Sequence, residues 1–137
     1  MIELELKFRI DDLSGLIGKI VDRGFKEVRF RTHELSIMYD NPEGLMQKTD
    51  GRIRLRQSGD RIELAYKKPI SREGIKKEIE YEVIISDLDN LQAILREMRF
   101  KPVSSYERYR TEYVLDNIKV TLDEYPFTSF VEVEGGE

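Results

Sequence analysis

The chain has 137 residues, of which 39% are hydrophobic and 36% are charged, and its formal net charge is −4. This length predicts one domain with a lean core, and the absence of cysteine excludes disulfides, thiolate metal sites and cysteine catalysis. No run approaches the roughly 18 apolar residues that span a bilayer, and the first residues lack the layout of a signal peptide. We therefore expect a cytoplasmic protein with no membrane partner, and the negative charge argues against bulk binding of nucleic acid.

The sequence predicts several short strands and two helices, recognised by apolar residues at a spacing of two or of three and four. In chain order, the predicted elements are a strand at 2–10, a helix at 12–24, one or two strands at 26–39, turns at 41–44 and 49–51, strands at 52–56 and 61–67 joined by a turn at 58–60, a strand at 76–85, a helix at 87–99, and strands at 106–115, 118–124 and 130–134. Asp11 or Asp12 can cap the first helix, which Gly24 ends, and Ser86 or Asp87 can cap the second.

Two stretches of the chain resemble each other at an offset of 75 residues. Glu3 and Glu5 correspond to Glu78 and Glu80, the apolar positions of the two helices coincide, and the pattern Phe-Lys-x-Val follows each helix. This repetition predicts a strand–helix–strand unit that is used twice, with a pseudo-twofold relation between the two copies.

Charged side chains occupy one face of nearly every predicted strand, because alternate residues of a strand point to opposite faces. Within a strand the charges often share one sign, as in Arg52, Arg54 and Arg56. Charged faces normally point to water, but the two helices also carry apolar stripes that need a partner. The outer face of a closed barrel would provide that partner. We therefore favour a closed antiparallel β-tunnel with a charged interior and helices packed outside, which is an α+β fold.

Cations and carboxylates in one cavity suit a polyphosphate bound together with divalent metal ions. Arginine and lysine bind phosphoryl oxygens, and arginine often does so with two parallel hydrogen bonds. Clustered glutamates and aspartates supply hard oxygen ligands for Mg²⁺ or Mn²⁺. The sequence thus favours a small-molecule triphosphate or nucleotide as the partner.

An ordered set of short motifs runs through the whole chain, and it resembles the CYTH superfamily of triphosphate tunnel metalloenzymes. This superfamily includes class IV adenylyl cyclases, thiamine triphosphatases and inorganic triphosphatases. The matching motifs are Glu3-Leu4-Glu5-Leu6-Lys7, Tyr39-Asp40, Arg52-Ile53-Arg54-Leu55-Arg56, Lys67-Lys68-Pro69, Glu78-Ile79-Glu80, Arg108-Tyr109-Arg110, Leu122-Asp123-Glu124 and Phe130-Val131-Glu132-Val133-Glu134.

The resemblance implies a single CYTH-like domain over residues 1–137, built as an eight-stranded antiparallel tunnel. Two features depart from the family pattern. The usual Leu-Gly before the last strand is replaced by Pro126-Phe127-Thr128-Ser129, and the sequence stops at Glu137, before the usual C-terminal helix. We interpret the early stop as a short form, a truncation, or a tunnel completed by a homodimer.

The resemblance also implies roles for individual residues. Direct participation in catalysis is expected of Glu5, Lys7 and Lys67. The expected triphosphate-binding residues are Lys7, Arg52, Arg54, Lys67, Arg108 and Arg110, and the expected ligands of one or two Mg²⁺ or Mn²⁺ ions are Glu3, Glu5, Glu78, Glu80, Asp123, Glu132 and Glu134. Glu82 is assigned no role, since neutralisation of Lys76 or Lys77 accounts for it.

The resulting functional hypothesis is a metal-dependent hydrolase of inorganic or organic triphosphates. The first alternative is a class IV adenylyl cyclase, which makes cyclic AMP and pyrophosphate from ATP with the same kinds of residue. We rank hydrolysis first because no adenine-reading motif is visible. The second alternative is a non-catalytic module that binds polyphosphate or nucleotides.

Overall fold

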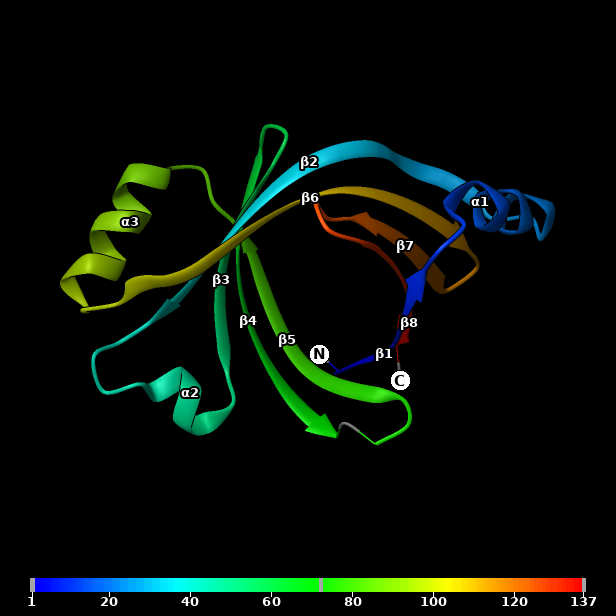
Figure 1. Ribbon diagram of the computed structural model, residues 1–137. Coiled ribbons are helices and arrows are strands. Elements are labelled where there is room, and N and C mark those ends of the chain that lie inside the picture. The colour runs from blue at the N-terminus through cyan, green and yellow to red at the C-terminus, as the bar shows by residue number, and fades with distance from the viewer. Residues whose placement is uncertain (1, 72, 137) are drawn as a thin grey trace.

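The barrel is closed and antiparallel, as the sequence predicted (Figure 1). The computed structural model describes residues 2–71 and 73–136, and within them eight strands follow the order β1-β5-β4-β3-β2-β6-β7-β8 around the barrel. The elements are β1 (Ile2–Ile10), α1 (Leu13–Asp22), β2 (Lys26–Asp40), α2 (Leu45–Thr49), β3 (Arg52–Ser58), β4 (Arg61–Ser71), β5 (Lys76–Ile84), α3 (Leu88–Glu97), β6 (Lys101–Leu115), β7 (Ile118–Glu124) and β8 (Ser129–Gly136). Within this described part, no helix is long and apolar enough to cross a membrane.

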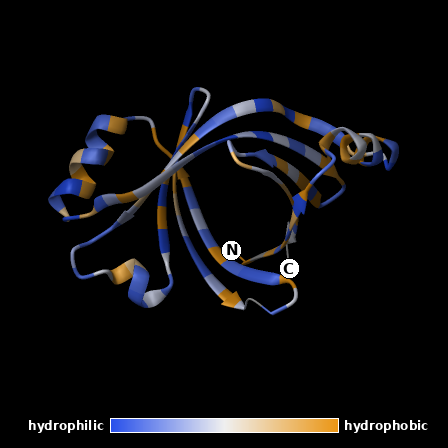
Figure 2. Ribbon diagram, viewed as in Figure 1, coloured by the Kyte–Doolittle hydropathy of each residue, from blue (hydrophilic) through white to orange (hydrophobic). Residues whose placement is uncertain are grey.

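The apolar cores lie outside the barrel, between its wall and the helices. Ile20 of α1 packs with Tyr113, Val120, Leu122 and Val131, which come from β6, β7 and β8. Hydrophobic and hydrophilic positions alternate along the strands in Figure 2. Since the hydrophobic positions face outward to the helix, the hydrophilic positions face into the barrel.

The second helix covers a different part of the wall. Leu95 of α3 packs with Tyr39 of β2 and Leu55 of β3. Figure 1 shows α1 and α3 at opposite ends of the long strands β2 and β6. Because α1 and α3 cover the outer face of the barrel, polar side chains occupy the tunnel interior. This confirms the predicted arrangement of helices packed outside a charged interior.

The predicted repeat is visible in the element bounds. Helices α1 and α3 begin and end 75 residues apart, and so do strands β2 and β6. These two long strands also pair with each other in antiparallel orientation. The barrel order places β2-β3-β4-β5 in one half and β6-β7-β8-β1 in the other, which is the arrangement that a pseudo-twofold relation predicts.

Helix α2 lies between the turns predicted at 41–44 and 49–51, in a stretch for which the sequence predicted no helix. The Asp40 carboxylate accepts hydrogen bonds from the backbone N–H groups of Met46, Asn41 and Gln47, and these bonds lower the pKa of Asp40. Side-chain oxygens that bind free N–H groups favour helix starts. Strand β6 also begins five residues earlier than predicted, since β2 pairs with it as far as Asp40↔Lys101.

Candidate active site

A cavity of about 720 Å³ lies inside the barrel, and every strand contributes charged or polar side chains to its lining. The predicted site residues on this lining are Glu5, Lys7, Arg52, Arg54, Lys67, Glu78, Glu80, Arg108, Arg110, Glu132 and Glu134. Asp123 is fully buried and is not on the lining. Glu3 belongs to β1, but its side chain falls outside the described part of the structure.

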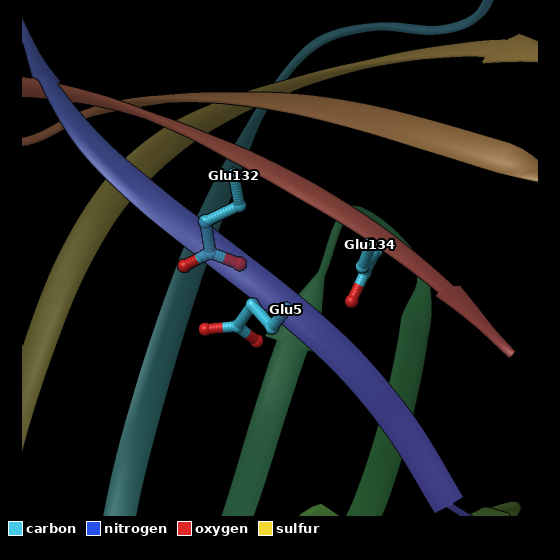
Figure 3. A group of neighbouring side chains, drawn as sticks. All are labelled: Glu5, Glu132 and Glu134. Carbon is cyan, nitrogen blue, oxygen red and sulfur yellow. The ribbon is translucent and has the colours of Figure 1, made fainter. Parts of the chain in front are cut away.

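The carboxylates of Glu5, Glu132 and Glu134 form one group, with one oxygen from each within 4.8 Å of the others (Figure 3). Strands β1 and β8 are neighbours, and their register pairs Glu5 with Glu134 and Lys7 with Glu132. Burial raises the pKa of Glu134, and the nearby Glu132 charge adds to this effect. Carboxylates crowded in this way favour a bound cation, and their hard oxygen donors suit Mg²⁺ or Mn²⁺.

Glu78 and Glu80 are two further predicted metal ligands, and they also pair with cations. Glu80 lies 3.3 Å from Lys67 Nζ, and Glu78 lies 2.9 Å from Lys76 Nζ and also pairs with Arg52. These contacts do not place either carboxylate in the group around Glu5 within the described residues. Their roles as metal ligands stay predictions.

Asp123 holds the arginines of β6 in place. It accepts hydrogen bonds from Arg110 Nε at 2.7 Å and Nη2 at 2.8 Å, and from Arg108 Nη1 at 3.3 Å. Burial alone would lower the pKa of Arg110, but the hydrogen bonds and charge of Asp123 raise it. Asp123 is thus a bidentate counter-ion of Arg110, and the two hydrogen bonds fix the orientation of its guanidinium group.

Glu34 is a buried carboxylate that the sequence reasoning missed. It is 1% exposed, accepts a hydrogen bond from Arg108 Nε at 2.9 Å, and lies 3.7 Å from the Nε atoms of Arg56 and Arg110. Burial alone would raise its pKa, but the charges of Arg110, Arg56 and Arg108 and a hydrogen bond from Ser58 lower it to about 2. Glu34 is therefore ionised and holds several arginines toward one wall of the cavity.

The signal for Glu34 was present in the sequence. Leu35, Ile37 and Tyr39 form the apolar face of β2, so strand alternation places Glu34 and Ser36 inside. The further charged or aromatic lining residues without a predicted role are Arg29, Arg56, Arg61, Glu63, Lys76, Tyr81, Glu82, Tyr106, Glu112, Lys119 and Tyr125.

Arg54, Arg56, Arg108 and Arg110 line the same cavity, and we call them the arginine wall. Arg56 donates to Ser36 Oγ and to Tyr106 Oη, both at 2.8 Å. Burial lowers the pKa of Arg56 to about 10, and the neighbouring Arg54 and Arg108 add to this effect. Burial would raise the pKa of Tyr106, but Arg56, Arg108 and Arg54 lower it to about 8. Burial is thus the main cause of the shift at Arg56, whereas the shift at Tyr106 arises because the crowded cations favour its anionic form.

Arg54 has a buried donor group that a ligand could satisfy. It is 7% exposed, its Nε atom has no hydrogen-bond partner among the described residues, and its Nη2 atom lies 3.9 Å from Glu82. A buried donor without a partner costs free energy. Phosphoryl oxygens entering the cavity would satisfy it.

We expect Arg54→Ala to weaken tripolyphosphate binding by about 1.5–3 kcal/mol, the scale of a hydrogen bond to a charged group. Isothermal titration calorimetry measures this loss. Arg96→Ala provides the control, because Arg96 lies exposed on α3. Equal affinities of the Arg54→Ala variant and the unmodified protein would contradict the assignment.

Glu82 should make stability depend on pH. Burial, together with its hydrogen bonds and proximity to Glu80 and Glu63, raises its pKa to about 7 from 4.5. The folded state therefore binds a proton at Glu82 more tightly than the unfolded state does. This binding adds to the free energy of unfolding below pH 4.5, and the added stability is lost as the pH rises through about 7.

We therefore expect Glu82→Gln to be more stable than the unmodified protein at pH 8, with a smaller difference near pH 4. Urea denaturation at a series of pH values measures this difference, with Glu97→Gln on the exposed face of α3 as the control. If the free energies of unfolding of the Glu82→Gln variant and the unmodified protein differ by the same amount at every pH, titration of Glu82 does not contribute to the pH dependence of stability.

Comparison with known proteins agrees with this geometry. A model of the CYTH domain family matches residues 1–135. A protein from Methanocaldococcus jannaschii, named as a candidate adenylate cyclase, is 27% identical over 124 residues, which cover 90% of this chain and 70% of the relative.

Solved structures show the same fold. A protein from Pyrococcus horikoshii superposes with a TM-score of 0.80 and 30% identity, over 98% of this chain and 78% of its own. A candidate adenylyl cyclase from Hippeastrum, described as having a dominant triphosphatase activity, gives a TM-score of 0.68 and 18% identity over 97% and 78% of the two chains. With the family model matching nearly its whole length, this chain belongs to the CYTH domain family.

Proposed function

We propose that this protein is a metal-dependent hydrolase of triphosphate substrates. The observation that carries the proposal is a single cavity with both kinds of group that a metal–triphosphate complex needs. Glu5, Glu132 and Glu134 provide a cluster of hard oxygen donors, and a dense arginine wall occupies the same cavity.

The carboxylate group suits Mg²⁺ or Mn²⁺ by its donor chemistry. Glu5, Glu132 and Glu134 would hold the ion, and Glu3 is proposed with them from the sequence motif. A bound ion would supply Lewis-acid stabilisation of the charge that develops during phosphoryl transfer.

The cations of the cavity would bind and orient the phosphate chain. Arg52, Arg54, Arg108 and Arg110 are proposed to contact its oxygens, and preorganised donors of this kind also stabilise charge on the leaving group. Arg110 has a fixed orientation because Asp123 binds it with two hydrogen bonds.

Two lysines are proposed to act closest to the reacting phosphoryl group. Lys7 Nζ lies 3.6 Å from Glu132, and Lys67 Nζ lies 3.3 Å from Glu80. Each ammonium therefore lies beside a carboxylate of the cavity, and we propose Glu5 as the third member of the catalytic set.

Adenylyl cyclisation is the second candidate, since the Methanocaldococcus jannaschii relative carries a cyclase name. Both reactions need the same cations and carboxylates, and they differ in which phosphorus atom meets the nucleophile. The triphosphatase activity described for the Hippeastrum protein favours hydrolysis as the first choice.

A product assay tests the proposal. The purified protein is incubated with Mg²⁺ or Mn²⁺ and either tripolyphosphate or ATP, and the products are resolved by phosphorus NMR. Orthophosphate released from either triphosphate supports the hydrolase. Cyclic AMP and pyrophosphate from ATP establish the cyclase instead, and binding of both compounds without products indicates a non-catalytic binding module.

A further inference from the structure

Aromatic rings gather at one edge of the charged cavity. Tyr125 and Phe127 stack with their ring centroids 5.5 Å apart and their planes at 27°, and Tyr106 lies 6.0 Å from Tyr125. We call these three residues the aromatic corner. They border a second cavity of about 330 Å³, which is completed by Leu35, Ser105, Glu107 and Pro126.

The aromatic corner is continuous with the triphosphate-binding cations. Tyr106 and Tyr125 line both cavities. Arg108 Nη1 donates a hydrogen bond to Tyr125 Oη at 3.1 Å, and Lys7 Nζ lies 6.0 Å from the centroid of the Tyr125 ring. A molecule with phosphates on Arg108 and Lys7 would therefore place its other end near these rings.

Burial contributes little to the position of the Phe127 side chain. Its side chain is 78% exposed, although an apolar ring of this size normally contributes by burial. The turn from Tyr125 to Thr128, closed by a 2.8 Å hydrogen bond from Tyr125 N–H to Thr128 O, holds the ring against Tyr125.

We propose that the aromatic corner binds the planar aromatic group of an organic triphosphate while the tunnel holds its phosphates. This inference rests on the proposed function and narrows its substrate class to triphosphate esters of aromatic compounds, such as nucleoside triphosphates. Stacking tolerates different rings because each has a π-face. The corner therefore selects organic over inorganic triphosphate without discriminating strongly between bases.

The test compares two ligands on matched variants. The ligands are ATP and tripolyphosphate analogues with methylene groups in place of the bridging oxygens, which resist cleavage, and calorimetry in Mg²⁺ gives each dissociation constant. We expect Phe127→Ala to raise the constant for the ATP analogue about tenfold and to leave that for the tripolyphosphate analogue unchanged. Phe30→Ala is the control, because Phe30 is 79% exposed on β2 and lines neither cavity.

The other outcomes separate this inference from the proposed function. An unchanged ATP analogue constant in Phe127→Ala, or an equal loss for both ligands, overturns the aromatic subsite. If the unmodified protein binds both ligands but converts neither ATP nor tripolyphosphate, the hydrolase is wrong while a selective effect of Phe127→Ala still supports the subsite. If it binds neither ligand, both proposals fail.

Discussion

Glu5→Gln is expected to abolish metal-dependent turnover of triphosphates while leaving the barrel folded. Glu5 is 6% exposed and belongs to the carboxylate group with Glu132 and Glu134. The amide keeps the shape of the side chain but removes its negative charge, so the group loses a hard anionic ligand. Loss of a group that only supports a metal ligand costs about 10–100-fold, and we expect loss of a ligand itself to cost at least about 100-fold in kcat/KM.

Two measurements make this prediction specific. The affinity for Mn²⁺, followed by calorimetry, should fall together with turnover, whereas the thermal unfolding midpoint should change little. Glu97→Gln is the control, since Glu97 is exposed at the end of α3. Turnover and Mn²⁺ affinity that both survive Glu5→Gln would remove Glu5 from the metal site.

Strand alternation alone predicted much of the tunnel. The alternating charges predicted that Glu5 and Lys7 share one face of β1 and that Arg54 lies on the charged face of β3. In the structure all three line the cavity. The apolar stripes of the two helices likewise predicted the outer cores, because such a stripe must pack on something. These features depend only on local periodicity, so they can be read without knowing which strands are neighbours.

Pairing between carboxylates and cations was not predictable in the same way. Asp123 shares its strand parity with the lining residues, yet it is buried against Arg110 and Arg108. The partner of a charged side chain depends on barrel order and register, in which Arg110 faces Asp123 on the adjacent strand. The position of α2 also escaped prediction, since it depends on the Asp40 carboxylate reaching forward to backbone N–H groups.

Glu34→Gln should be the most destabilising single change in the cavity. The carboxylate is 1% exposed and lies between Arg108, Arg56 and Arg110. Removing one partner of a buried ion pair leaves uncompensated charge and typically costs about 3–5 kcal/mol. Urea denaturation at pH 7 measures this loss, and Glu107→Gln, whose carboxylate is exposed and pairs with His33, should cost about 1 kcal/mol or less.

The pH dependence of the loss follows from the pKa of Glu34. The arginines lower this pKa to about 2 from 4.5, so the stabilising contribution is fully present above pH 4.5 and is lost as the pH falls through about 2. The stability difference between the unmodified protein and Glu34→Gln should therefore shrink as the pH falls below about 4. A difference that stays constant down to pH 2.5 would contradict this account.

The Glu34→Gln variant also tests whether the arginine wall binds a ligand or has only a structural role. Without Glu34 the arginines lose one of their buried anions, and a bound triphosphate would supply negative charge in its place. A ligand at 100 times its dissociation constant stabilises the folded state by about 2.7 kcal/mol, and a tighter complex adds to this at the same concentration. We therefore expect tripolyphosphate to raise the unfolding midpoint of Glu34→Gln by more than it raises that of the unmodified protein. An equal or smaller rise would mean that the phosphate chain does not approach Arg56, Arg108 and Arg110.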